Sequence, residues 1–235
     1  MLGALRGRIL EAARRRGFAR NPGTMEAALA RCAARKPVLG SVIDVGASDG
    51  RWSRAASRIL PPARYLMVEA RTEHEPGLAR MARDARFGYE ICAAGDRDGE
   101  IYFDATELFG GLASETPPEK NAIVVPVRRL DGLAKARGLT GPYAIKLDTH
   151  GYEVPILEGA GDLLAQCVLL VIECYNFRVA PQSLLAHEMC AWLEARGFRC
   201  IDLCDPLHRA RDGALWQMDL FFAPATDAAF ASNVY

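Results

Sequence analysis

The strongest constraint on the fold is a regular alternation between short β-branched runs and helical segments, which begins after Pro37. Strands that alternate with helices are typical of a parallel sheet covered by helices on both faces. No long helix lies between the last two predicted strands, which favours an antiparallel orientation of the last strand. The sequence therefore predicts an α/β fold: a doubly wound, mostly parallel sheet with an antiparallel last strand, preceded by a short N-terminal helical segment. The predicted strands are residues 41–45, 65–69, 89–93, 143–147, 168–173, 200–203 and 218–222.

The zero net charge of the 235-residue chain hides two regions of opposite charge. Residues 1–40 hold nine Arg and Lys against two Glu, and the remainder carries an equal excess of acidic side chains. We interpret residues 1–37 as a basic N-terminal helical segment and residues 38–235 as one domain, because the chain is too short for two full domains. The balanced total charge excludes a protein dominated by nucleic-acid electrostatics, so no nucleic acid is expected as a partner.

The composition also indicates the cellular compartment in which the protein is expected. No uncharged apolar run reaches the roughly 18 residues that span a bilayer, and Arg6, Arg8 and Glu11 interrupt the N-terminal apolar stretch. We therefore expect neither a transmembrane segment nor a secretory signal. The seven cysteines form no Cys-x-x-Cys pair, which favours buried thiols in a reducing, cytoplasmic compartment. The four histidines are scattered, which argues against zinc, and no metal site is predicted. Assistance by a divalent ion is left open, since Asp148, Glu153 and Glu173 could supply oxygens.

A glycine-bearing turn follows the first predicted strand. Residues 42–50 read Val-Ile-Asp-Val-Gly-Ala-Ser-Asp-Gly, and a predicted helix begins directly after them. Glycines allow positive φ and a close approach of backbone to ligand, and the helix N-terminus offers free N–H groups. Glu69, at the end of the next strand, has the spacing of acids that accept hydrogen bonds from a ribose. An ordinary tight turn is the alternative for each residue alone, but the combination predicts a cofactor site formed by Asp44, Gly46, Ser48, Gly50 and Glu69.

The chemistry of this turn suggests which cofactor binds. The complete Gly-x-Gly-x-x-Gly pattern of dinucleotide sites is missing, and Asp44 would crowd a pyrophosphate. An acid beside the turn suits a ligand with an ammonium or sulfonium group instead. We therefore predict S-adenosyl-L-methionine, and a nicotinamide-dependent oxidoreductase stays a less favoured alternative.

The densest group of polar residues is Lys-Leu-Asp-Thr-His-Gly-Tyr-Glu at residues 146–153. Lys146 lies inside an apolar strand, and burying an ammonium is costly without a partner. Asp148 lies two residues further on the same strand face, which makes it a candidate counter-charge. The strand end, the glycine and the following helix place Asp148, His150 and Glu153 at the carboxyl edge of the sheet, where open α/β sheets bind ligands. A purely structural ion pair with a helix-terminal acid is the alternative.

Together these segments resemble the FkbM family of S-adenosylmethionine-dependent methyltransferases. The resemblance covers roughly residues 38–224, and its most specific part is the Lys-x-Asp-x-x-Gly-x-Glu block followed by Leu-Glu-Gly-Ala at residues 157–160. Residues 93–99 also resemble the family's stretch after the third strand, which adds Asp96 to the expected cofactor site. The resemblance implies a class I, Rossmann-like fold and methyl transfer to a hydroxyl of a sugar, polyketide or other secondary metabolite.

Methylation of a hydroxyl requires an oxygen held near the methyl carbon and removal of its proton. Asp148 is the first candidate to orient or deprotonate the acceptor, and His150 is the second because imidazole titrates near neutrality. Lys146 is expected to fix Asp148, and Glu153 to anchor the loop or the substrate. The family often has Glu or Gln in place of His150, so an imidazole base is not its general mechanism. Glu173 ends the next strand and is a further candidate for the same cleft.

Other functions and partners remain open at this point. A non-catalytic cofactor-binding or partner-binding module could use the same fold. The basic N-terminus suggests a nucleic-acid methyltransferase, but the chain lacks an Asn-Pro-Pro-Tyr-like base-flipping motif. The expected partner is a small-molecule hydroxyl acceptor such as a sugar, a glycolipid or a polyketide, and a homo-oligomer is left open.

Two irregular regions interrupt the alternation. Residues 96–100 have the composition of a tight turn and predict a hairpin between residues 89–94 and 101–103. Residues 110–120 contain Gly-Gly and Pro-Pro, which predicts a loop that covers the substrate.

Overall fold

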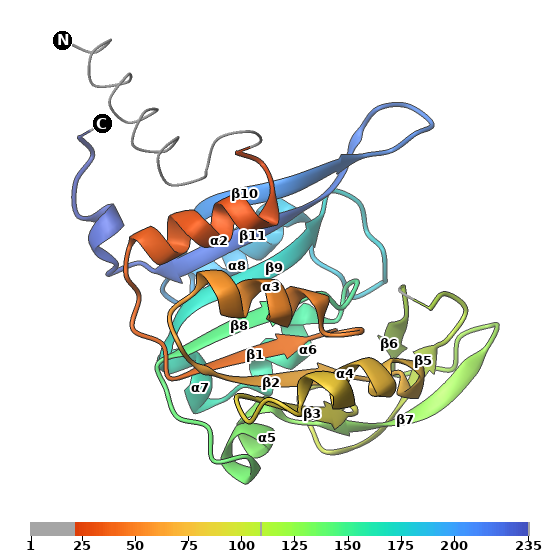
Figure 1. Ribbon diagram of the computed structural model, residues 1–235. Coiled ribbons are helices and arrows are strands. Elements are labelled where there is room, and N and C mark those ends of the chain that lie inside the picture. Colours follow the sequence, from red (N-terminus) through yellow and green to blue (C-terminus); the bar gives the residue numbers. More distant parts are fainter. Residues whose placement is uncertain (1–21, 109, 235) are drawn as a thin grey trace.

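A seven-stranded sheet forms the centre of the computed structural model, which describes residues 22–108 and 110–234 (Figure 1). The strands at its centre pair in parallel, whereas the strand nearest the C-terminus runs antiparallel to both of its neighbours. The predicted doubly wound, mostly parallel sheet with an antiparallel last strand is therefore confirmed. In spatial order the strands are β10 (Phe198–His208), β11 (Leu215–Pro224), β9 (Cys167–Tyr175), β8 (Tyr143–Leu147), β1 (Ser41–Val45), β2 (Arg64–Glu69) and β3 (Phe87–Ile91).

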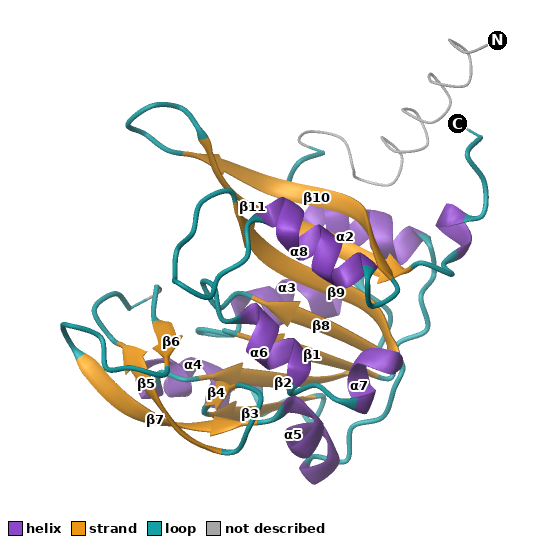
Figure 2. Ribbon diagram, turned by 180° about the vertical axis from the view of Figure 1, so that it is seen from behind, coloured by secondary structure: helices purple, strands orange, loops and turns teal. Residues whose placement is uncertain are grey.

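Helices cover both faces of this sheet, as Figures 1 and 2 show from opposite sides. One face carries α2 (Met25–Ala34), α3 (Arg51–Ile59) and α4 (Glu75–Met81). The other face carries α5 (Leu130–Ala136), α6 (Glu153–Glu158), α7 (Asp162–Ala165) and α8 (Ala186–Glu194). None of the helices in the described part of the chain has the length and apolar character needed to cross a membrane.

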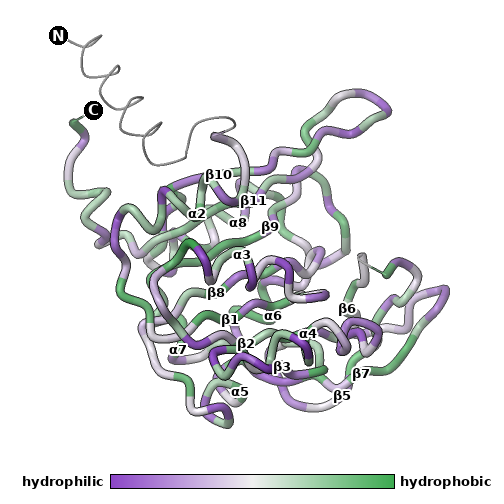
Figure 3. Tube along the Cα trace, viewed as in Figure 1, coloured by the Kyte–Doolittle hydropathy of each residue, from purple (hydrophilic) through white to green (hydrophobic). Residues whose placement is uncertain are grey.

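Burial on both faces explains why the central strands are almost continuously apolar. Every residue of β1 and β8 is buried, and β9 has a single half-buried position. Figure 3 shows the hydrophobic colour along these strands and the hydrophilic colour on the outer turns. The two layers of core side chains, one under each set of helices, make the sheet a rigid support for the loops at its edge.

A second, smaller sheet lies beside the edge of the first (Figure 2). It contains β4 (Ala93–Ala94), β7 (Ala122–Arg128), β5 (Gly99–Asp104) and β6 (Leu112–Ser114), in this spatial order. The predicted hairpin is therefore wrong, because β7 lies between β4 and β5 and pairs with both. The loop predicted at residues 110–120 contains a short strand, because β6 lies within it and pairs with β5.

The helical segment that follows β8 is divided into α6 and α7. Gly159 ends α6. Any side chain at this position would overlap the carbonyl oxygen of Gly95. Gly161 then has a φ of 50°, which lets the chain change direction before α7. The Leu-Glu-Gly-Ala segment thus holds the helix against the start of the small sheet.

The predicted N-terminal helical segment lies mostly outside the described residues, and its described part forms α2. This helix is fixed to β10 by Arg31, whose guanidinium makes a two-pronged contact of 2.7 and 2.9 Å with the Asp202 carboxylate. Asp205 also accepts a hydrogen bond of 3.0 Å from the Met25 N–H at the start of the helix. The first described helix and the strand at the far edge of the sheet therefore form one unit.

Candidate functional site

A cavity of about 550 Å³ opens at the carboxyl ends of the parallel strands. It lies where β1 has β2 on one side and β8 on the other, the position at which open α/β sheets bind ligands. The glycine turn after β1 and Glu69 at the end of β2 form one end of the lining. Asp148, His150 and Glu173, after β8 and at the end of β9, form the other end.

The glycine turn is held by backbone contacts. Gly46 has a φ of 71° and Ser48 a φ of 51°, so the chain folds back sharply after β1. A side chain at position 46 would overlap the carbonyl oxygen of Asp148. The N–H groups of Gly46 and Ala47 both donate to the Val68 carbonyl, at 3.0 and 3.1 Å. The turn therefore connects the ends of β1, β2 and β8.

Glu69, one of the predicted cofactor residues, lines the cavity and is buried. Its two carboxylate oxygens accept hydrogen bonds from the Ser48 N–H at 2.7 Å and the Arg71 N–H at 2.8 Å. Each oxygen keeps a second lone pair for a ligand. Beside it, the Ser48 hydroxyl and the Trp52 indole N–H are buried and have no hydrogen-bond partner among the described residues. Buried polar atoms of this kind are costly unless a ligand or water satisfies them.

Three of the predicted cofactor residues do not line the cavity within the described structure. Asp44 is completely buried beneath the turn, where the Ser53 hydroxyl donates to it at 2.7 Å. Gly50 begins α3 with a φ of 81° and packs against methionine side chains. Asp96 is exposed and pairs with Arg97 at 3.3 Å. Direct contact with a ligand is thus available to Gly46, Ser48 and Glu69.

Lys146 joins the two ends of the site. Its ammonium lies 3.3 Å from the Asp44 carboxylate, 3.1 Å from the Asp148 carboxylate and 3.2 Å from the Gly46 carbonyl oxygen. The side chain is almost fully buried, with 4% of the residue exposed. Burial disfavours the ammonium, but the charges of Asp44 and Asp148 outweigh burial and raise the pKa of Lys146. The ion pair expected between Lys146 and Asp148 is present, and Asp44 is a second partner.

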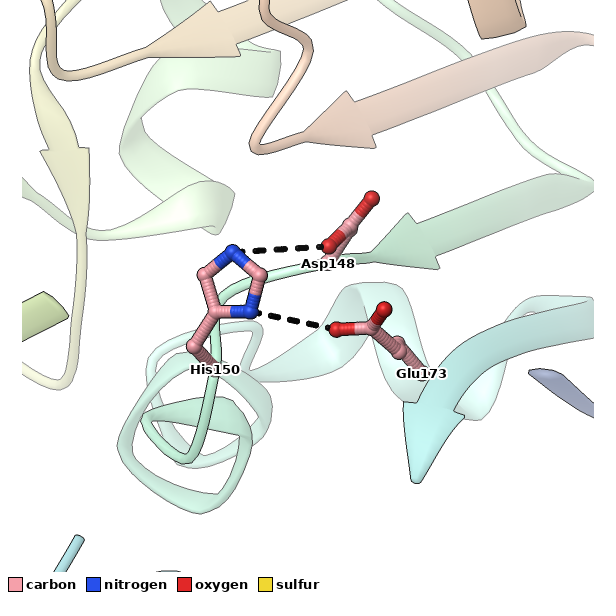
Figure 4. A group of neighbouring side chains, drawn as sticks. All are labelled: Asp148, His150 and Glu173. Atoms are coloured by element: carbon pink, nitrogen blue, oxygen red, sulfur yellow. Dashed lines mark ion pairs between the residues drawn. The ribbon is translucent and has the colours of Figure 1, made fainter. Parts of the chain in front are cut away.

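At the other end of the cavity, His150 lies between two carboxylates (Figure 4). Its Nδ1 is 3.2 Å from Glu173 Oε2, and its Nε2 is 3.9 Å from Asp148 Oδ1. The ring reaches this position because His150 has a φ of 55°, which is uncommon for a residue with a side chain. Burial opposes protonation, but Glu173 and then Asp148 outweigh it and raise the pKa of His150. Burial also opposes the ionisation of Asp148, yet Lys146 and His150 lower its pKa.

Further residues at this end were not predicted. The Tyr175 hydroxyl lies 2.7 Å from His150 Nδ1 and donates a hydrogen bond of 2.5 Å to Glu173. The side-chain amide of Gln217 donates to the other oxygen of Glu173. Asp219, directly opposite Glu173 in the sheet, also lines the cavity. Burial and then the charge of Glu173 raise the pKa of Asp219 to about 7.

Glu153 is the one predicted catalytic residue that the described structure leaves out of the cavity lining. It is buried at the start of α6 and accepts hydrogen bonds from the Gly151 N–H at 2.9 Å and the Thr149 hydroxyl at 3.2 Å. Burial raises its pKa. These contacts fix the turn that carries His150.

Asp148, His150 and Glu173 are also residue types that bind metal ions, and one ligand atom of each lies within 4.8 Å of the others. Lys146 already neutralises Asp148, however, and Tyr175 and Glu173 both engage Nδ1 of the imidazole. The described contacts are those of a network of hydrogen bonds and ion pairs.

Comparison with known proteins adds a family to this geometry. The model of the family described as the methyltransferase FkbM domain matches residues 44–200, which is more than half of the chain. No curated protein matches the chain.

Several solved structures have a similar fold at low sequence identity. One, assigned as an RNA methyltransferase from Pyrococcus horikoshii, has 13% identity and a TM-score of 0.49 over 87% of this chain and 86% of that one. Another, assigned as an O-methyltransferase from Klebsiella pneumoniae, has 15% identity and a TM-score of 0.48 over 93% and 88%. The 1,6-didemethyltoxoflavin-N1-methyltransferase of Burkholderia thailandensis, with bound S-adenosylhomocysteine, has 15% identity and a TM-score of 0.46 over 85% and 77%.

Proposed function

The chain belongs to the FkbM methyltransferase family, and we propose that it transfers a methyl group from S-adenosylmethionine to a hydroxyl group of a small organic acceptor. The observation that carries this proposal is one cavity with two chemically different ends. One end offers an acid with free lone pairs and unpartnered buried donors. The other end offers an imidazole between two carboxylates.

The residues at the glycine turn fit S-adenosylmethionine. Glu69 would hold the ribose hydroxyls, because each of its oxygens can accept one more hydrogen bond. The unpartnered Ser48 hydroxyl and Trp52 N–H are suited to the polar groups of the same ligand. When bound, the cofactor supplies an electrophilic methyl group on a cationic sulfur.

The other end of the cavity supports a hydroxyl acceptor. Asp148 and His150 present a carboxylate oxygen and a ring nitrogen 3.9 Å apart, a pair of groups that can orient a hydroxyl and receive its proton. Lys146 keeps Asp148 ionised and fixed, and Glu153 fixes the turn that carries His150. The chain's contribution is thus to position the acceptor oxygen and to manage one proton. Sugars and polyketides carry such hydroxyl groups, and we propose them as the acceptor class.

Calorimetry with S-adenosylhomocysteine tests the division of the cavity into two ends. The Glu69→Ala substitution should weaken binding about tenfold or more, because it removes a charged hydrogen-bond acceptor worth roughly 1.5–3 kcal/mol. The Asp148→Asn substitution should leave binding within about threefold of the wild type and lower turnover instead. The exposed Glu158→Gln is the matched control, since it removes a carboxylate that is not part of the cavity lining.

Transfer itself is measured with methyl-labelled S-adenosylmethionine and a panel of sugar and polyketide hydroxyl compounds. Label in an ether-linked methyl group supports the proposal. Binding of S-adenosylhomocysteine that is unchanged in Glu69→Ala would contradict the cofactor site. Label found only in nitrogen or carbon positions of an acceptor would contradict O-methylation.

A further inference from the structure

We propose that Glu173 and Tyr175 are positioning residues that hold His150 in the tautomer with its proton on Nδ1, so that Nε2 is the general base for the acceptor. The proposal rests on the proposed function, because a base is required there only when a hydroxyl is methylated. His150 then takes the place of Asp148 as the base, and Asp148 keeps the role of orienting the acceptor.

The hydrogen bonds around Tyr175 determine where the imidazole proton lies. A tyrosine hydroxyl has one proton, and that of Tyr175 is directed to Glu173 Oε2 at 2.5 Å. Toward His150 Nδ1, 2.7 Å away, the same hydroxyl can then only accept. Glu173 Oε2 lies 3.2 Å from Nδ1 and, as a carboxylate, also only accepts. Both neighbours of Nδ1 therefore require an N–H at this position, and in neutral imidazole this leaves Nε2 unprotonated.

Other residues hold Glu173 in place for this task. Gln217 donates to its Oε1, which leaves Oε2 to Tyr175 and His150. Asp219 lies opposite Glu173 on β11. Burial and the charge of Glu173 raise the pKa of Asp219 to about 7, so Asp219 is partly protonated at neutral pH. A protonated Asp219 relieves the repulsion between the two neighbouring acids.

Nε2 is the atom left for the acceptor. It lies 3.9 Å from Asp148 Oδ1, beyond hydrogen-bond distance, and His150 lines the cavity. In the reaction, a lone pair of the acceptor oxygen forms the new O–CH₃ bond, and the acceptor O–H bond breaks and leaves its electron pair on that oxygen. The C–S electron pair stays on sulfur, which loses its positive charge, and the proton goes to Nε2. The imidazolium that forms lies between Asp148 and Glu173, which stabilise its charge, and it returns the proton to solvent after the product leaves.

The charged groups around His150 set the direction of the pH dependence. Asp148 lies beside it after β8, Glu173 on β9, and Glu153 at the start of α6 also acts on its charge. Lys146 contacts Asp148, and Asp219 lies opposite Glu173 on β11. Burial lowers the pKa of His150, but Glu173, Asp148 and Glu153 raise it above its ordinary value of 6.5. A base must be neutral to accept a proton, so the rate of methyl transfer should rise as the pH increases through this raised pKa.

Long-range ¹H–¹⁵N NMR of the uniformly labelled full chain tests the tautomer directly, without turnover. The His150→Gln substitution assigns the signals of this ring among the four histidines. Above the pKa of the ring, the expected spectrum has Nδ1 as the protonated nitrogen and Nε2 as the unprotonated one. An Nε2–H tautomer, or an average of the two forms, in the wild-type chain would overturn the proposal.

Two variants test the positioning role. Glu173→Gln should reduce the Nδ1–H fraction and lower the pKa of His150, because its amide can donate to Nδ1. Tyr175→Phe should have the smaller effect, since Glu173 still accepts from Nδ1. The exposed Glu194→Gln is the control and should change neither quantity. Unchanged tautomer and unchanged pKa in a folded Glu173→Gln variant would also overturn the proposal.

The rate profile separates this proposal from the proposed function. In Glu173→Gln, the rise in methyl-transfer rate should move to lower pH together with the pKa of His150. A profile that does not move with the NMR pKa contradicts His150 as the base while transfer itself stands. No transfer to any hydroxyl compound, with the expected tautomer in place, contradicts the proposed function instead.

Discussion

The two ends of the cavity are built from different kinds of contact. At the glycine turn, backbone N–H groups and carbonyls fix the structure, and the Glu69 carboxylate is held by two N–H groups. At the other end, side chains hold side chains: His150 contacts Tyr175 and Glu173, and Glu173 contacts Gln217. Backbone groups do not titrate, whereas most members of the second network do. The first end should therefore keep its shape over a wide pH range, and the second should change its charge near neutrality.

Lys146 is the residue that joins the two ends, so its replacement should cause the largest loss in the free energy of unfolding. Lys146→Met leaves the buried Asp44 and the carboxylate of Asp148 without their cation. Breaking a buried ion pair by removing one partner costs roughly 3–5 kcal/mol, and we expect a loss of this size in the free energy of unfolding. Urea denaturation at pH 7 measures it.

Lys135→Met is the matched control, because Lys135 is exposed on α5. It should change the free energy of unfolding by less than about 0.5 kcal/mol. A loss below about 1 kcal/mol in Lys146→Met would show that the two ends do not depend on this cation.

The next largest effect is expected at the backbone-built end. Gly46→Ala introduces a methyl group that overlaps the Asp148 carbonyl oxygen, at a residue with a φ of 71°. Strain and overpacking each cost roughly 1–3 kcal/mol, so we expect a loss of about 2–4 kcal/mol in the free energy of unfolding. Gly132→Ala, where an added Cβ meets no atom within 4 Å, should be neutral or slightly stabilising. Equal losses in both variants would contradict the steric explanation.

The smallest effect concerns the pH dependence at the side-chain-built end. The pKa of Asp219 is raised from 3.8 to about 7 in the folded protein. Between these values the folded state binds a proton that the unfolded state does not, so stability falls as the pH rises from about 4 to about 7. Asp219→Asn should reduce the stability difference between pH 5 and pH 8 by roughly 1–2 kcal/mol, a value discounted for partial exposure.

Urea denaturation of wild type and variant at both pH values measures this difference. The exposed Asp162→Asn is the control and should keep the wild-type slope. His150 also has a raised pKa, and its contribution to stability is likewise lost as the pH rises, so some slope should remain in Asp219→Asn. An unchanged slope in Asp219→Asn would contradict the assignment.

Local patterns were sufficient to predict the parallel strands and part of the site. Asp148 directly follows β8, two residues after Lys146, so their contact follows from the extended backbone at the strand end. The glycine turn and Glu69 follow from the spacing within one βα unit. These contacts depend on residues that are close in sequence or on a common motif.

The contacts that were missed depend on which strands become neighbours. Asp44 meets Lys146 because β1 and β8 pair in a register that places these residues side by side. His150 meets Glu173 and Tyr175 because β9 is the next strand in the sheet. The hairpin was mispredicted for the same reason, since β7 pairs with β5 although a long segment separates them. No local pattern in the sequence specifies such pairings.

The position of β11 has a consequence for the order in which the chain can assemble during synthesis. Within the described structure β10 pairs only with β11, and β11 lies between it and β9. On the ribosome, β10 emerges before β11, yet it has no sheet edge to join until β11 has been added. Arg31 contacts Asp202 on this same edge strand. The first described helix, α2, is thus anchored to a strand that joins the sheet late. The part of the cavity lining that Asp205 and Asp219 form is completed only when β11 is in place.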